Sequence, residues 1–255
     1  MLKAVLFDID DTLIDWSHFT DDWMTLEMKH LSGVFDYLSA ELGMMLTDVT
    51  PFLSEFRSRA AQAWTTGRDT LIAPNVGAVL IETAVALGAP AEKIEMKRVL
   101  TAYGWRAIPG TKIFPEVHDV IPMLKAAGVK VGMVTNAFQP MSLREIELGI
   151  DGHNILDYFP DCRISAADVG FLKPHPSIFE LALETIGATA AETVFVGDDP
   201  EADVVGAQGV GMKAVLRHIE RRPFSETHDD IKPDAIVRDL HQLLPLLDTW
   251  YPNWR

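Results

Sequence analysis

Residues 5–13 read VLFDIDDTL, a short apolar run that ends in three carboxylates and a threonine. The apolar residues before Asp8 predict a buried parallel strand. Asp8 and Asp10 follow at its carboxyl end, the edge where open α/β sheets bind ligands, and their spacing puts both side chains on one side. Two close carboxylates require a cation or a shared proton, and Mg²⁺ prefers oxygen ligands. An acidic turn that caps a helix is the alternative.

Length, charge and cysteine content limit the possible partners. The 255 residues carry a formal net charge of -15 and a single cysteine, Cys162. The charge argues against nucleic acid or an anionic membrane surface as the main partner. Because residues 1–3 lead directly into the predicted first strand, we expect no signal peptide. No apolar run approaches the roughly 20 residues that span a bilayer. A lone cysteine is compatible with a reducing compartment, and we expect the protein to be cytoplasmic. We expect it to be a monomer or a homodimer.

The segment 16–109 shows helical periodicity and no strand signal. Apolar residues recur at steps of three and four from Phe19 to Leu42, and Gly43 is a stop signal. Thr50 before Pro51 predicts the N-cap of a second helix. Further apolar faces predict helices over 76–87 and 96–103. We therefore expect a helical bundle inserted directly after the first strand.

From Thr111 onward, helical segments alternate with short apolar runs. The runs at 129–134, 162–165, 193–196, 213–216 and 235–237 predict strands. Such alternation predicts a parallel sheet with right-handed crossovers, hence an α/β fold. We expect a core domain of residues 1–15 and 110–255 and a helical domain of residues 16–109. The charged, proline-containing segment 217–233 predicts a surface loop.

Functional side chains follow three later stretches as well. Thr135 and Asn136 follow the run 129–134, where a hydroxyl and backbone N–H groups can hold an oxyanion. A cap of the next helix is the alternative role for Thr135. Lys173 stands before two prolines, and a solvated loop lysine is its alternative. Asp198 ends the run 193–196 as a third carboxylate for a metal. Asp199, before Pro200, predicts a helix cap.

These residue types fit phosphoryl transfer. Asp8 would attack phosphorus, and Asp10 would protonate the leaving oxygen and then deprotonate water. Thr135, the N–H groups after it and Lys173 would hold the phosphate oxygens. Mg²⁺ would bridge Asp8 and the phosphate, with Asp198 completing the site. Asp203 would orient Lys173 or a metal-bound water.

The stretches FDIDDTL, VTN, KPHP and GDDPEAD resemble, in order and spacing, the four motifs of the haloacid dehalogenase (HAD) superfamily. The resemblance implies a Rossmann-like core with a C1-type helical cap. It also implies Asp8 as nucleophile, Asp10 as acid/base and, through its backbone carbonyl, metal ligand, and Asp198 as the further Mg²⁺ ligand. Thr135 and Lys173 would hold the phosphate, with Asn136 beside them. Two departures stand out: Asp11 replaces a common glycine, and His175 replaces an aspartate, which should weaken a helix cap.

Asp10 discriminates among the activities that this resemblance implies. Members that cleave carbon–halogen bonds lack the second aspartate, so we predict a phosphatase acting on a small phosphorylated metabolite. A phosphomutase, a dehalogenase-like hydrolase and a non-catalytic HAD-fold binding protein are the alternatives. The helical segment should set specificity. Its candidates for substrate contact are Trp16, His18, Trp64, Arg68 and Asp69, whereas Trp23, Trp105, Trp250 and Trp254 are expected to pack.

Overall fold

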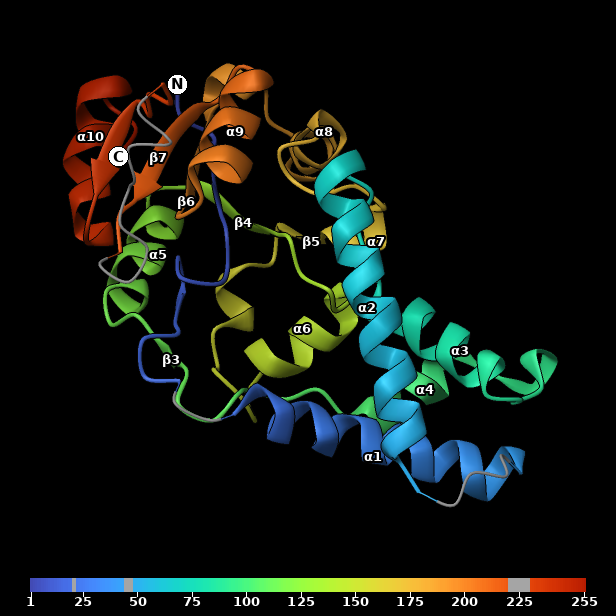
Figure 1. The fold of residues 1–255 in the computed structure, drawn as a ribbon. Coiled ribbons are helices and arrows are strands. Elements are labelled where there is room, and N and C mark those ends of the chain that lie inside the picture. The colour runs from blue at the N-terminus through green and yellow to red at the C-terminus, as the bar shows by residue number, and fades with distance from the viewer. Residues whose placement is uncertain (20–21, 44–47, 220–229) are drawn as a thin grey trace.

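A computed structural model describes residues 1–19, 22–43, 48–219 and 230–255. Its centre is a six-stranded, all-parallel sheet in the order β5-β4-β1-β6-β7-β8 (Figure 1). The strands are β1 (Ala4–Phe7), β4 (Lys130–Thr135), β5 (Cys162–Ser165), β6 (Thr193–Gly197), β7 (Lys213–Arg217) and β8 (Ala235–Val237). The predicted α/β class with a parallel sheet is confirmed.

Alternating side chains of the strands build two apolar layers. Val5 and Phe7 of β1 face a core with α5 and α10, whereas Ala4 and Leu6 face a core with α8 and α9. The helices of this part are α5 (Val117–Ala126), α6 (Met141–Leu148), α7 (Ala166–Val169), α8 (Pro176–Ile186), α9 (Gly206–Gly209) and α10 (Leu243–Trp250). A π-helical turn, η4 (Pro200–Val205), follows β6, and 3-10 turns occupy Ala91–Lys93, Leu156–Tyr158, Ala190–Glu192 and Leu240–Gln242.

Four helices lie between the first two motifs and share a separate apolar core (Figure 1). They are α1 (Trp23–Leu42), α2 (Thr50–Thr70), α3 (Val76–Ala86) and α4 (Met96–Tyr103). The chain enters and leaves this helical segment through a two-stranded antiparallel ribbon. Its strands are β2 (Ile14–Asp15), before the helices, and β3 (Lys112–Ile113), after them. Backbone hydrogen bonds also tie residues 71–73 to residues 170–172, for example Leu172 N–H to the Leu71 carbonyl at 2.8 Å. The helical segment thereby contacts the loop that leads to Lys173.

Several local expectations are corrected. Thr50 is not the cap of α2, because Val49 is, and the Thr50 N–H donates to the Asp48 carboxylate at 2.8 Å. Arg217 does not open a surface loop: it ends β7 and is buried, donating to the Thr12 carbonyl at 3.0 Å and to Glu116 at 2.5 Å. Part of the predicted loop, residues 220–229, lies outside the described residues. Among the helices described, none combines the length and apolar character needed to cross a membrane.

Two motif departures have local explanations. Asp11 has a φ of 62°, in the left-handed region where glycine is most easily accommodated. His175 does act as the N-cap of α8, because its Nδ1 accepts the Ser177 N–H at 3.3 Å. The ring therefore replaces the carboxylate expected at that position.

Candidate active site

The four motif stretches meet at the carboxyl edge of the sheet. They line a cavity of about 210 Å³ whose walls include every catalytic, phosphate-binding and metal-binding residue selected from the four motifs. The lining residues are Asp8, Asp10, Thr135, Asn136, Lys173, Asp198, Asp199, Ala202 and Asp203. Residues up to 195 positions apart in the chain, from Asp8 to Asp203, thus share one small volume, because parallel strands end at the same edge.

Lys173 is the buried cation at the centre of this cavity. Its Nζ donates to Oδ1 of Asp8 at 2.6 Å, to Oδ1 of Asp203 at 2.6 Å and to the Val134 carbonyl at 3.0 Å. Burial alone lowers the pKa of Lys173, but the two carboxylates outweigh it and raise the pKa, so the ammonium is kept. The solvated-lysine alternative is wrong, since Lys173 is only 3% exposed.

Asp203 contacts Lys173, one of the two roles expected for it. Its second oxygen, Oδ2, accepts the Asp199 N–H at 3.0 Å. A Cβ on Gly197 would lie 2.1 Å from that oxygen, so only glycine lets the carboxylate come this close to the end of β6. Asp199 itself caps η4, accepting from Glu201 N–H at 2.9 Å and Ala202 N–H at 2.8 Å, as predicted.

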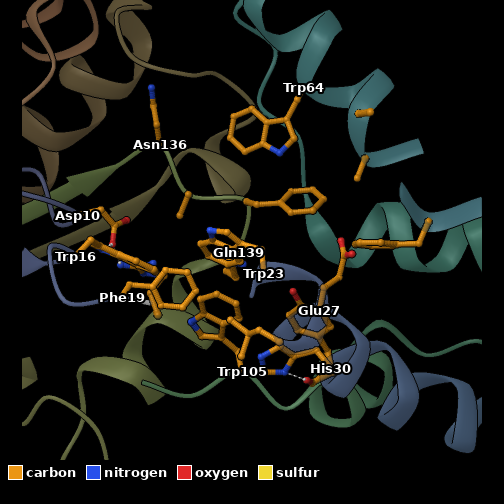
Figure 2. Close-up of a pocket in the computed structure, with 18 of the residues that line it drawn as sticks. Asp10, Trp16, Phe19, Trp23, Glu27, His30, Trp64, Trp105, Asn136 and Gln139 are labelled. Carbon is orange, nitrogen blue, oxygen red and sulfur yellow. Dashed lines mark hydrogen bonds and ion pairs between the residues drawn. The ribbon is translucent and has the colours of Figure 1, made fainter. Parts of the chain in front are cut away.

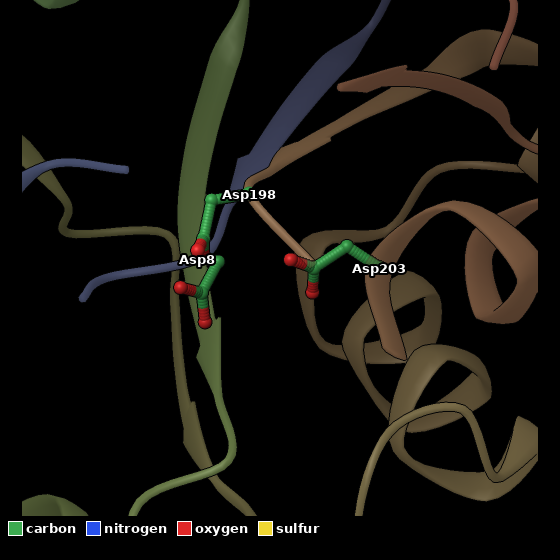
Figure 3. Close-up of side chains that lie close together, drawn as sticks. All are labelled: Asp8, Asp198 and Asp203. Carbon is green, nitrogen blue, oxygen red and sulfur yellow. The ribbon is translucent and has the colours of Figure 1, made fainter. Parts of the chain in front are cut away.

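Three carboxylates fit a hard divalent cation. Ligand oxygens of Asp8, Asp198 and Asp203 lie within 4.8 Å of one another (Figure 3). Burial raises the pKa of Asp8 to about 7, opposed by Lys173 and increased by Asp203 and Asp10, so this site favours additional positive charge. Both Asp203 oxygens accept hydrogen bonds, one from Lys173 and one from the Asp199 N–H. The Asp10 carboxylate lies outside this group.

Asp10 is held by two donors from different elements. Its Oδ1 accepts the Trp16 indole N–H at 2.9 Å and Nη2 of Arg144 at 2.9 Å. Arg144 was not selected from the sequence, although Met141, Arg144 and Leu148 share one face of α6 and are all buried. A charge on an apolar helical face is the signal that could have identified it.

Arg144 also faces a buried acid on its own helix. Its Nε lies 3.3 Å from Oε2 of Glu147, which accepts the Trp105 indole N–H at 2.7 Å. Burial raises the pKa of Glu147 to about 7, with Arg144 lowering it and Asp10 raising it further. Trp105 was expected to pack only, but it connects the helical segment to this network.

Thr135 lies in the cavity wall, whereas the Asn136 side chain bonds to the backbone of Lys173. Thr135 ends β4 and is 1% exposed in the wall of the cavity. The Asn136 side chain exchanges two hydrogen bonds with the Lys173 backbone, donating to its carbonyl at 2.9 Å and accepting its N–H at 2.7 Å. Asn136 therefore holds the Lys173 loop with the side chain that was expected to contact substrate.

Comparison with known proteins identifies the family. The model of the haloacid dehalogenase-like hydrolases matches residues 2–211. The chain belongs to this family. It is 25% identical, over 97% of both chains, to a protein of Methanocaldococcus jannaschii named glyceraldehyde 3-phosphate phosphatase.

Two solved structures are similar to this hydrolase over nearly their whole length. One is a 2-haloacid dehalogenase from Pseudomonas syringae, with a TM-score of 0.65, 26% identity and coverage of 98% of this chain and 100% of that chain. The other is a HAD phosphatase from Thermococcus onnurineus, with a TM-score of 0.57, 27% identity and coverage of 96% and 98%.

A second, larger cavity of about 700 Å³ shares Asp10 and Asn136 with the small one in this HAD-like hydrolase. Figure 2 shows the side chains that line the larger cavity. Trp16 and Trp64 line it, as expected, whereas the lining does not include His18, Arg68 or Asp69. Trp23 and Trp105 do line it, so the expectation that they only pack was wrong. Trp250 and Trp254 pack in the core as predicted.

Proposed function

We propose that this HAD-like hydrolase is a Mg²⁺-dependent phosphatase that cleaves a small phosphate monoester through an aspartyl-phosphate on Asp8. The observation that carries the proposal is the Asp8–Lys173 contact of 2.6 Å in a cavity shared with Asp10, Thr135 and Asp198. Relatives named as phosphatases over almost the whole chain support it. Residues 16–109 would form the cap that covers the substrate.

Each residue has a separate task in this proposal. An oxygen of Asp8 forms a bond to phosphorus while the ester P–O bond breaks, and Asp10 gives its proton to the departing alcohol oxygen. Asp10 then takes a proton from water, whose oxygen bonds to phosphorus as the bond to Asp8 breaks and phosphate leaves. Thr135 and Lys173 hold the phosphate oxygens throughout.

The Asp8–Asp198 pair would hold the metal, with the Asp10 backbone carbonyl as a further ligand. Mg²⁺ bound there would supply charge that offsets the repulsion between the Asp8 carboxylate and a phosphate dianion. Asp203 would keep the Lys173 ammonium directed at the same oxygens. Nucleic acid and membranes remain unexpected partners, given the net charge of -15.

Dehalogenation is the second candidate, favoured by the similarity to the 2-haloacid dehalogenase of Pseudomonas syringae. Asp10 argues against it, because a halide leaves without needing a proton. The hydrogen bonds from Trp16 and Arg144 fix the Asp10 carboxylate beside the cavity, an arrangement that suits proton transfer to an oxygen leaving group.

The test is Mg²⁺-dependent phosphate release from a generic aryl phosphate, with halide release from a 2-haloacid measured in parallel. Asp8→Asn should lower phosphate release by at least about a thousandfold, whereas Asp15→Asn, outside the cavity lining, should leave it within about twofold. Chelation of Mg²⁺ should abolish turnover. Wild-type phosphate release no faster than that of Asp8→Asn, or halide release alone, would contradict the proposal.

A further inference from the structure

The two cavities adjoin each other at the proposed reaction centre. Asp10 and Asn136 line both of them. A phosphate held at Asp8 in the 210 Å³ cavity therefore has its ester group directed toward the 700 Å³ one. The larger volume lies in the range of pockets that enclose drug-sized ligands, about 300–1,000 Å³, and far exceeds what a three-carbon phosphate fills.

Aromatic rings form two opposite walls of this larger cavity (Figure 2). On one side Trp16 stacks on Trp23 at 5.8 Å between centroids, with Phe19 4.9 Å from Trp23. On the other side Trp64 lies 5.9 Å from Phe138. Trp23 is 53% exposed, so a large apolar face stays open to the cavity and its mouth.

One buried acceptor in the wall is without a donor. Nδ1 of His30 lies 2.7 Å from the Tyr103 carbonyl, which only accepts, so Nδ1 carries the proton. Nε2 is then an acceptor, and within the described residues it has no hydrogen-bond partner although His30 is 7% exposed. Burial lowers the pKa of His30, which keeps the ring neutral. His30 therefore brings no charge to the wall of the cavity.

The cavity offers no spare positive charge for a second anionic group. Arg144 is the one cationic side chain among the described residues of the lining, and Asp10 and Glu147 already balance it. Glu27, an acid of the same wall, is paired with Arg57 at 2.5 Å. A substrate with a second phosphate or a carboxylate therefore gains little here.

We propose that the ester group of the substrate contains an uncharged planar ring system, joined to the phosphate through a sugar or sugar alcohol. Nucleoside 5′-monophosphates and flavin mononucleotide share this chemistry. The ring would stack between the Trp64 and Trp23 walls while the phosphate occupies the small cavity. This inference rests on the phosphatase proposed above and specifies its substrate class.

The test compares esters that differ only in the ring. Phosphate release by the full chain with Mg²⁺ is measured for adenosine 5′-monophosphate and flavin mononucleotide against ribose 5-phosphate and glyceraldehyde 3-phosphate. We expect kcat/KM for at least one ring-bearing ester to exceed that for ribose 5-phosphate at least about tenfold, the effect of one ring stack. Trp64→Leu should reduce this ratio. Trp250→Leu, a half-buried tryptophan of the core, should leave the ratio unchanged.

Binding separates failure of this inference from failure of the phosphatase proposal. Titration calorimetry with Asp8→Asn should give at least about tenfold tighter binding of a ring-bearing ester than of ribose 5-phosphate, whether or not the wild type turns over. If the wild type turns over but ring-bearing esters show neither higher kcat/KM nor tighter binding than ribose 5-phosphate, the proposed substrate class is wrong and the phosphatase proposal is retained. If ring-bearing esters bind more tightly but the wild type does not hydrolyse them, the role of the larger cavity is supported and the phosphatase proposal is wrong.

Discussion

Arg144 donates from Nη2 to Oδ1 of Asp10 over 2.9 Å, linking the floor of the aromatic cavity to the proposed acid/base. The same oxygen accepts the Trp16 indole N–H. The orientation of the Asp10 carboxylate is therefore set from two sides, and in the proposed mechanism its other oxygen would face the leaving group. Holding a catalytic group in a fixed orientation lowers the entropic contribution to the activation free energy of the proton transfer.

Trp16→Phe tests this orientation, because it keeps a ring and removes the N–H. A hydrogen bond to a charged group is worth about 1.5–3 kcal/mol, so we expect kcat to fall about tenfold to a hundredfold. The loss should be greater for esters with poor leaving groups, which need the proton most. The measurement is kcat across aryl and alkyl phosphates. Trp250→Phe, a change at a half-buried tryptophan outside both cavity linings, is the control, and equal losses in both variants would refute the assignment.

Glu147 should make stability depend on pH. Its pKa is raised from 4.5 to about 7, so the folded state holds the proton more tightly than the unfolded chain. This contribution to the free energy of unfolding is fully present below about pH 4.5 and is lost as pH rises through about 7, by an amount on the order of 3 kcal/mol. Urea unfolding of Glu147→Gln should show a flatter pH profile than the wild type. Glu145→Gln, the more exposed acid on the same helix, should keep the wild-type slope, and a steep profile in Glu147→Gln would exclude this origin.

Lys173→Met should strongly destabilise the fold, because it leaves buried carboxylates of Asp8 and Asp203 without their cation. Breaking a buried pair costs about 3–5 kcal/mol, whereas an exposed pair contributes about 1 kcal/mol or less. Lys213→Met, which breaks a partly exposed contact of 3.3 Å with Asp234, is the matched control. Denaturant unfolding measures both. The double variant Lys173→Met/Asp203→Asn should recover part of the loss, and equal costs for the two lysines would contradict the burial argument.

Mg²⁺ should stabilise the folded protein through Asp8 and Asp198. At a concentration of a hundred times Kd, binding to the folded state alone adds about 2.7 kcal/mol, seen as a rise in Tm. Asp198→Asn should lose most of this rise. Asp199→Ala removes a helix cap and should cost about 1 kcal/mol while retaining the response to Mg²⁺. A full Mg²⁺ response in Asp198→Asn would place the cation elsewhere.

The sequence alone was sufficient to select the small cavity. Asp8, Thr135 and Asp198 each follow an apolar strand, and parallel strands bring their carboxyl ends to one edge whatever the loops between them do. Lys173 lies in a loop, where its own surroundings favour a solvated side chain. It was selected by its place among the motifs, and its burial depends on Asp8 and Asp203, which no local pattern specifies.

Some elements were too short or too dependent on partners to predict. The ribbon of β2 and β3 has two residues in each strand, too few for a period-two pattern to appear. Arg217 follows an apolar strand and precedes a charged segment, so it was expected at the surface. Its burial follows from contacts with Thr12 and Glu116, residues at least 101 positions away.

The sequence by itself determined the parallel sheet, the inserted helices and the acids and lysine at the sheet edge, since apolar periodicity and strand ends are local features. Tertiary structure alone decided that Arg144 and Trp16 hold Asp10 and that Trp23 and Trp105 line a cavity. The physical reason is that periodicity reports which side of an element avoids water. Whether that side meets a packed core or an open cavity depends on how distant elements dock against it.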